Sequence, residues 1–194
     1  MTRADVKTYL GISSTNDDDV LNELINAAQG LIESFTHRKF DVTSATSKYF
    51  DAEDDVENRK LLFTEGLEIC AAPTAVTNGD GTSFTVNTDY VYLPRNDFPA
   101  YGLEILQSSS NWWQGKSNGD MANAITVTAQ WGYSSTPPND IVQAARRLSA
   151  FLYRQRDTNA DTDRPIIVDG VTILPSALPK DVERMLLPYV LRTN

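Results

Sequence analysis

The sequence predicts an α+β protein, in which a small helical scaffold carries a large inserted antiparallel β region. Apolar residues recur at helical spacing near both ends of the chain, from Val20 to Phe35 and from Ile141 to Leu152. Between these stretches, over residues 41–133, the period changes to two and turn residues multiply. The predicted helices therefore lie on either side of one long inserted β region.

The predicted organisation has three parts. Residues 1–40 and 134–157 form a helical core, residues 41–133 form the inserted β region, and residues 158–194 form a linker, a hairpin arm and a final helix. A length of 194 residues suits one domain with a large insertion.

Two helices are predicted at the N-terminus. Thr2 and Asp5 have the spacing of a capping box, so the first helix runs from Thr2 to Leu10 and ends at Gly11. The second begins with the run 17–19, three aspartates at the positive end of the helix dipole. A calcium loop needs ligands at alternate positions, a turn glycine and a distal glutamate, which this run lacks. Helix capping is therefore the favoured interpretation.

The inserted region is predicted to hold seven strands, because apolar and polar residues alternate within short runs bounded by turn signals. The candidate strands are 46–50, 67–70, 75–77, 83–86, 90–93, 103–107 and 124–131. Residues 78–81 form a hairpin turn, since asparagine, aspartate and glycine tolerate positive φ. The acidic run 51–57 is interpreted as a solvated connection.

Apart from Trp112 and Trp113, residues 108–120 are polar and contain glycine. This composition predicts an exposed loop. Paired tryptophans have two interpretations. One ring closes the open end of a small barrel, or the pair stacks on a sugar. The first is favoured and the second stays open.

A long central helix follows Pro137 and Pro138 and runs to about Asp157, with an apolar stripe that must be buried. It carries four arginines, which form either a solvated face or a subunit contact. These residues are Arg146, Arg147, Arg154 and Arg156.

The C-terminal part begins with a polar linker, residues 158–164, and continues with the apolar run 166–174, predicted to form two short strands around Asp169 and Gly170. A lone hairpin is marginal in water, so this run is interpreted as an arm that donates strands to another chain. A short helix over 179–187 ends at Pro188. The candidate contact residues of this part are Ile166, Ile167, Val171, Ile173, Leu186, Leu187, Tyr189 and Val190.

Composition excludes several classes of function. Twenty-six acidic against seventeen basic residues give a net charge of −9, the wrong sign for broad phosphate binding. The N-terminus lacks the apolar core of a signal peptide, the apolar runs are too short to span a membrane, and a single cysteine precludes an internal disulfide. Synthesis inside the cell is expected.

The search for catalytic chemistry finds little. His37 and Cys70 lie in different elements, and the sequence has neither a glycine-rich phosphate loop nor metal-ligand spacing. We therefore expect no enzyme, no cofactor and no metal. Acidic pairs such as Glu53 with Asp54, or Glu65 with Glu68, leave a small hydrolase as an alternative.

Five stretches follow one another along the chain, namely YLGI, DDDVLNELINAAQGLIESFTHRKF, ITVTAQWGY, IVQAARRLSAFLYRQRD and VERMLLPYV. This order of parts resembles the head-tail connector (adaptor) family of tailed bacteriophages. Members are similar in the acidic start of the second helix with its LI-x-AA, the strand ending in GY before a proline, the long helix with Tyr-x-x-Arg and the short last helix. The hairpin arm and the tryptophan loop depart from this pattern.

The resemblance implies a structural virion protein without catalysis. Its subunits would form a ring under the portal, with the portal's twelvefold symmetry, continue the DNA channel without reading sequence, and offer a platform to the next tail-completion or stopper protein. Assembly would take place in the host bacterial cytoplasm and leave the protein in the virion neck. The alternative is a β-rich carbohydrate- or receptor-binding virion module that uses Trp112 and Trp113.

Overall fold

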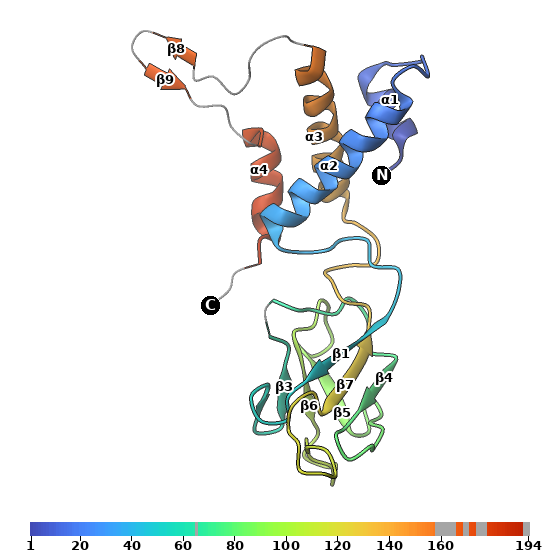
Figure 1. Cartoon of the computed structure of the whole chain (residues 1–194), viewed down its shortest axis with the longest axis vertical. Coiled ribbons are helices and arrows are strands. Elements are labelled where there is room, and N and C mark those ends of the chain that lie inside the picture. The colour runs from blue at the N-terminus through green and yellow to red at the C-terminus, as the bar shows by residue number, and fades with distance from the viewer. Residues whose placement is uncertain (65, 158–165, 169–170, 174–177, 192–194) are drawn as a thin grey trace. The chain divides into compact units, whose positions relative to one another are not determined.

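The structure is a computed structural model that describes residues 1–64, 66–157, 166–168, 171–173 and 178–191. The chain divides into two compact units. The helical unit contains residues 1–38 and 138–192, and the β unit contains residues 39–137 (Figure 1). The predicted α+β class is confirmed.

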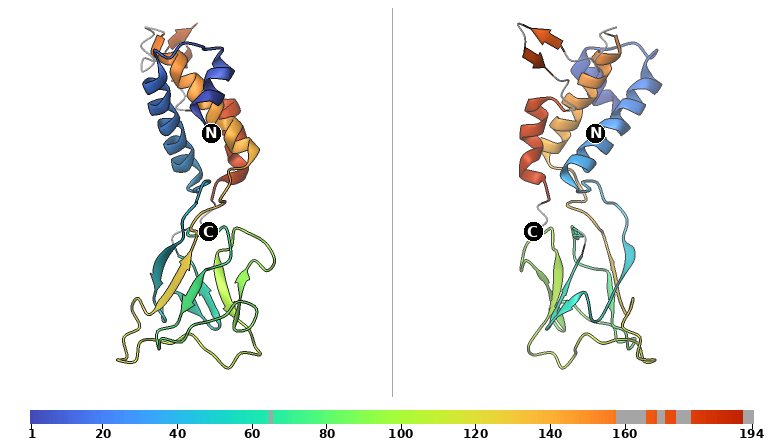
Figure 2. Two further views of the ribbon diagram at one scale, coloured as in Figure 1. Left: turned by 90° about the vertical axis from the view of Figure 1, so that its right-hand side faces the viewer. Right: turned by 60° about the vertical axis from the view of Figure 1, so that its left-hand side comes forward.

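The helical unit is organised around one central helix. Its helices are α1 (Arg3–Leu10), α2 (Asp18–Thr36), α3 (Asn139–Asp157) and α4 (Lys180–Leu186), and the 3₁₀ turn η1 (Leu187–Tyr189) follows α4. Helices α1, α2 and α4 all pack against α3, as Figure 2 shows from two sides. Fully buried side chains from all four helices form the core, among them Val6, Leu21, Leu148 and Val182.

The ends of the first two helices follow their sequence signals. The Thr2 hydroxyl accepts a hydrogen bond from the Asp5 amide at 3.3 Å, and the Asp5 carboxylate accepts from the Thr2 amide at 2.8 Å, which completes the capping box. Gly11 ends α1 with φ 71°, and His37 ends α2 with φ 56°. Both predicted helices are confirmed.

The β unit contains two antiparallel sheets, which isolated β-bridges connect. One has the order β1 (Thr46–Phe50), β7 (Ile125–Ala129), β4 (Ala75–Thr77), and the other β2 (Val56–Glu57), β3 (Lys60–Leu62), β6 (Gly102–Ile105), β5 (Tyr90–Leu93). Ile69 bridges to both Ala100 and Trp131 and so joins the two sheets. Inward side chains of both sheets, such as Leu61, Leu103 and Val127, fill one core.

Three details of the β unit differ from prediction, and the first is β3, for which the sequence predicted no strand. The run 51–57 is not only a connection, because Val56–Glu57 forms β2 and pairs with β3. Val56 is half-buried against the core. Carboxylates surround it in the sequence, so the strand shows no alternation of apolar and polar residues. The predicted strands 67–70 and 83–86 are reduced to isolated bridges.

The C-terminal part has a hairpin of β8 (Ile166–Val168) and β9 (Val171–Ile173), paired antiparallel as a two-stranded sheet of their own. The predicted pair of short strands is confirmed, while the linker 158–164 lies outside the described residues. None of the helices in the described part of the chain is long and apolar enough to cross a membrane.

Candidate assembly surface

The arginines predicted on α3 do not form one cluster. Arg147 Nη1 donates to Asp181 Oδ2 of α4 at 2.6 Å, and Arg154 lies on the same side of the helix. Arg146 lies towards α1, where it contributes to a lowered pKa of Asp5, after the larger effect of the hydrogen bonds from Thr2. The side chain of Arg156 lies outside the described residues.

A groove of about 180 Å³ lies between α1, α3 and α4. It combines an apolar lining with charge, and its lining includes Tyr9, Arg147, Phe151, Arg154, Pro179 and Asp181. The hydrogen bond from Arg147 is the main reason that the pKa of Asp181 lies below its ordinary value. Two arginines against one aspartate leave the groove with a net positive charge. This groove, together with Arg154 at its edge, is the part of the predicted arginine surface that can receive a partner.

The apolar C-terminal residues are divided between the core and the surface. Leu186 is fully buried, so its exposure, expected from the sequence, is wrong. Val182 and Leu186 are four residues apart on one face of α4, which packs on α3. That i, i+4 spacing was the signal in the sequence that places Leu186 inside.

The segment after α4 also packs on its own unit. The Leu191 amide donates to the Thr36 carbonyl of α2 at 2.9 Å, and Tyr189 and Val190 are half-buried. Among Leu186, Leu187, Tyr189 and Val190, Leu187 is the well-exposed side chain, at 53%. The prediction that the chain from Pro165 onward is ordered mainly by contact with a partner is therefore wrong for residues 178–191, because α4 completes the core of its own unit. The side chains of Ile166, Ile167, Val171 and Ile173 lie outside the described residues.

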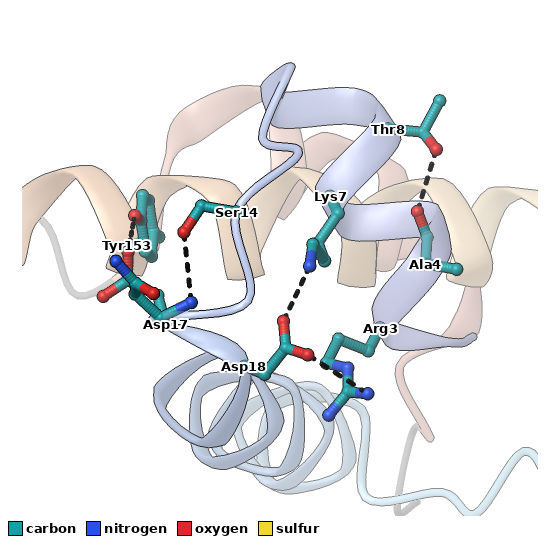
Figure 3. A network of polar contacts seen from close by, with 9 residues as sticks. Arg3, Ala4, Lys7, Thr8, Ser14, Asp17, Asp18 and Tyr153 are labelled. Atoms are coloured by element: carbon teal, nitrogen blue, oxygen red, sulfur yellow. Dashed lines mark hydrogen bonds and ion pairs between the residues drawn. The ribbon is translucent and has the colours of Figure 1, made fainter.

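The aspartates before and in α2 hold the helices together (Figure 3). Asp18 binds Lys7 Nζ at 2.7 Å and Arg3 Nη2 at 3.3 Å, which ties α1 to α2. Asp17 accepts a hydrogen bond from the Tyr153 hydroxyl of α3 at 2.8 Å. Asp17 occupies the N-cap position, yet its side chain makes no capping hydrogen bond, so the capping interpretation is wrong for this residue. No group of three or more metal-ligating side chains occurs in the described ranges.

The two tryptophans of the 108–120 loop have different surroundings. Trp113 is buried against Phe84, and its Nε1 donates to the Arg59 carbonyl at 2.9 Å, so it closes the core as the favoured interpretation predicted. Trp112 is 52% exposed, with the Arg59 guanidinium 4.3 Å from its ring centre. The Trp112 carbonyl accepts from Asn78 Nδ2 at 3.0 Å, which fixes this loop on the 78–81 turn.

The residues weighed for catalysis do not assemble. His37 belongs to the helical unit and Cys70 to the β unit. Burial raises the pKa of the Cys70 thiol, which keeps it in its less nucleophilic protonated form, and burial raises the pKa of Tyr90 to about 12. Glu53 and Asp54 are exposed, Glu68 is buried, and Glu65 lies outside the described residues. Among the described residues, His37 and Cys70 therefore lie in separate units, and the protonated Cys70 thiol is not an activated nucleophile.

Comparison with solved structures shows what this fold is similar to. A chain from the neck of an empty gene transfer agent (GTA) particle, computed with C6 symmetry, has 16% identity and a TM-score of 0.61, over 100% of this chain and 91% of that chain. A chain from the neck of the native GTA particle, computed with C12 symmetry, has 17% identity and a TM-score of 0.57, over 98% and 89%. A chain of the native GTA virion has 18% identity and a TM-score of 0.55, over 100% and 91%.

Sequence comparison gives a match at the N-terminus. No curated protein matches the chain in sequence. Residues 1–62, from α1 to the end of β3, match the model of the phage gp6-like head-tail connector proteins. This match confirms the resemblance to the head-tail connector family over residues 1–62, and the likeness in fold to neck chains extends over the whole chain.

Proposed function

We propose that this protein is a structural subunit of a head-tail connector, which forms a ring under the portal of a phage-like particle. The observation that carries the proposal is the family match over residues 1–62 combined with a fold similar to neck chains along the whole length. Neck chains solved with C6 and C12 symmetry support a cyclic assembly, and we propose twelve subunits in register with the portal.

The charge of the chain suits a DNA channel. A net charge of −9 on each subunit repels the phosphate backbone, whereas a basic ring would hold DNA through release of its counterions. DNA would then pass through the ring without sequence-specific binding. The other face of the ring would receive the next tail-completion or stopper protein, and the finished ring would remain in the virion neck.

The proposed contact surfaces are the groove between α1, α3 and α4, the turn η1, and the hairpin of β8 and β9. Arg147 and Arg154 line the groove, and Leu187 is exposed. We propose that the hairpin of β8 and β9 acts as an assembly arm, because its strands pair only with each other in their sheet. The arm would add its strands to a neighbouring subunit or to the portal.

Native mass spectrometry tests this proposal. The purified chain is measured alone and after mixing with the portal protein of the same particle. We expect a closed ring of defined mass, either spontaneously or on the portal. A chain that stays monomeric in both samples, while circular dichroism shows it folded, contradicts the proposal.

Two sets of variants separate the connector from the alternatives. His37→Ala and Cys70→Ala should support particle formation in a complementation assay, except through any loss of stability, because neither side chain has a chemical role. Trp112 is the observation that favours a glycan-binding module, since its ring is exposed on a fixed loop. Saturable glycan binding that is lost in Trp112→Ala but kept in Tyr49→Ala, an exposed aromatic of β1, would favour that module.

A further inference from the structure

Helix α2 carries a second apolar stripe beside the one that faces the core. The core stripe contains the buried residues Leu21, Ala28 and Ile32. The second stripe follows the steps of four and three that keep residues on one face of a helix, and it lies about 90° around the helix from the first. Its residues are Val20, Leu24, Ala27 and Leu31.

This second stripe is partly open to solvent, chiefly at Ala27 and Leu31. Leu31 is 38% exposed, Ala27 is exposed, and Val20 and Leu24 are half-buried. On its outer side the stripe is bordered by the exposed carboxylates Asp19 and Glu23. It is therefore an apolar ridge with a negative edge.

The groove between α1, α3 and α4 has the complementary character. Tyr9, 45% exposed, and the half-buried Phe151 are its apolar surfaces, while Arg147 and Arg154 outweigh Asp181 in charge. Ridge and groove belong to the same compact unit, so their chemistry can be compared without reference to the β unit. An apolar ridge with a negative edge fits an apolar groove with a positive edge.

We propose that the α2 ridge of one copy docks into the groove of the next copy of this chain. This inference rests on the proposed ring, and it names the two surfaces that close it. A cyclic ring needs a heterologous interface, in which two different surfaces of each subunit meet. The helical unit offers such a pair, with Leu31 and Leu24 placed against Tyr9 and Phe151, and Glu23 placed near Arg154.

Cross-linking of mixed copies tests the pairing directly. In a Cys70→Ser background, one preparation carries Ala27→Cys on the ridge and the other carries Tyr9→Cys at the groove. A short bismaleimide should link the two preparations when mixed under ring-forming conditions, and should link neither of them alone. Linkage of Ala27→Cys copies to each other would show a symmetric α2 contact and overturn the proposal. Absence of linkage in the mixture would overturn it too, and would leave the ridge to another occupant such as the hairpin of β8 and β9.

Charge exchange is an independent test. Glu23→Arg and Arg154→Glu should each lower the association constant of the ring by about tenfold or more, because each places like charges together at every interface. The double variant on one chain restores opposite charges and should recover assembly to within about threefold of the original. Lys39→Glu, an exposed charge change in the β unit, serves as the control. Additive loss in the double variant would overturn the pairing.

The outcomes also separate this inference from the proposed function. If the unsubstituted chain forms rings but the mixed cysteine variants do not cross-link, the pairing of ridge with groove is wrong and the proposed function stands. A folded chain that forms no ring with the portal protein overturns both.

Discussion

The hydroxyl of Tyr153 donates a 2.8 Å hydrogen bond to the carboxylate of Asp17, which joins the late turns of α3 to the start of α2. These residues are 136 positions apart in the chain, and the β unit lies between them in sequence. The contact therefore connects the two sequence segments of the helical unit, which the β unit separates in the chain. It also explains why the side chain of Asp17, at the N-cap position, makes no capping hydrogen bond to its own helix.

Tyr153→Phe should destabilise the helical unit by about 1.5–3 kcal/mol, the usual value for a hydrogen bond to a charged group. The free energy of unfolding is measured by urea denaturation, followed by circular dichroism. Tyr9→Phe removes an exposed hydroxyl and should change stability little. Equal effects of the two substitutions would show that the Tyr153 contact contributes nothing.

Leu148→Asp should prevent accumulation of folded protein. Leu148 is fully buried at the centre of α3, and an unpaired carboxylate there costs roughly 3 kcal/mol or more. Gln143→Asp places the same side chain on the exposed face of the same helix and should fold. Soluble expression and the melting temperature are the measurements, and an unchanged melting temperature for Leu148→Asp would refute the core assignment.

Stability should fall in acid through the capping box of α1. The pKa of Asp5 is held below its ordinary value of 3.8, first by the backbone and side-chain hydrogen bonds from Thr2. A carboxyl with a lowered folded pKa stabilises the protein above 3.8, and this contribution is lost as the pH falls through the folded value. Urea denaturation between about pH 5 and pH 2 should therefore show a shallower decline in Asp5→Asn than in the original chain. An unchanged decline would contradict the capping contribution, and Thr2→Ala should give a partial effect.

Gly79 should tolerate no side chain, because a Cβ there would overlap the backbone of Gln114 and Gly115. Gly79→Ala should cost about 1–3 kcal/mol and loosen the loop that carries Trp112 and Trp113, which tryptophan fluorescence reports. Gly30→Ala is the matched control in α2, where a Cβ meets nothing within 4 Å. It should stabilise the helix by about 0.5–1 kcal/mol. A neutral Gly79→Ala would show that the loop moves aside at no cost.

The sequence predicts most of the helices and part of the sheets, for a physical reason. In α2 and α3 the apolar period is long and unbroken, so burial of one face determines the structure. Strands β2 and β3 have two and three residues, too few for alternation to emerge beside five nearby carboxylates. The local sequence pattern predicts such short strands poorly, because their pairing with strands distant in sequence determines the structure.

The candidate surface was harder to predict than the fold. Four arginines at similar spacing look alike in sequence, but Arg147 meets Asp181 of α4 and Arg146 lies near Asp5 of α1. Which side each arginine takes depends on where α1 and α4 pack, and that follows from contacts distant in sequence. Leu186 and Leu187 show the same effect, since the first is fully buried and the second exposed.

Hydrogen exchange should distinguish the hairpin arm from the last helix. Strands β8 and β9 have three residues each and form a separate two-stranded sheet, so by themselves they protect few amides. Ordering such a segment costs about 1–2 kcal/mol per residue in backbone entropy, which burial of its isoleucines and valines against a neighbour can offset. Amides of residues 166–174 should therefore exchange fast in the isolated chain and slowly in the assembled ring. Amides within α4 should be protected in both states, because Val182 and Leu186 are buried in their own unit. Strong protection of the hairpin in an isolated monomer would show that it belongs to the core of its own chain and not to an assembly arm.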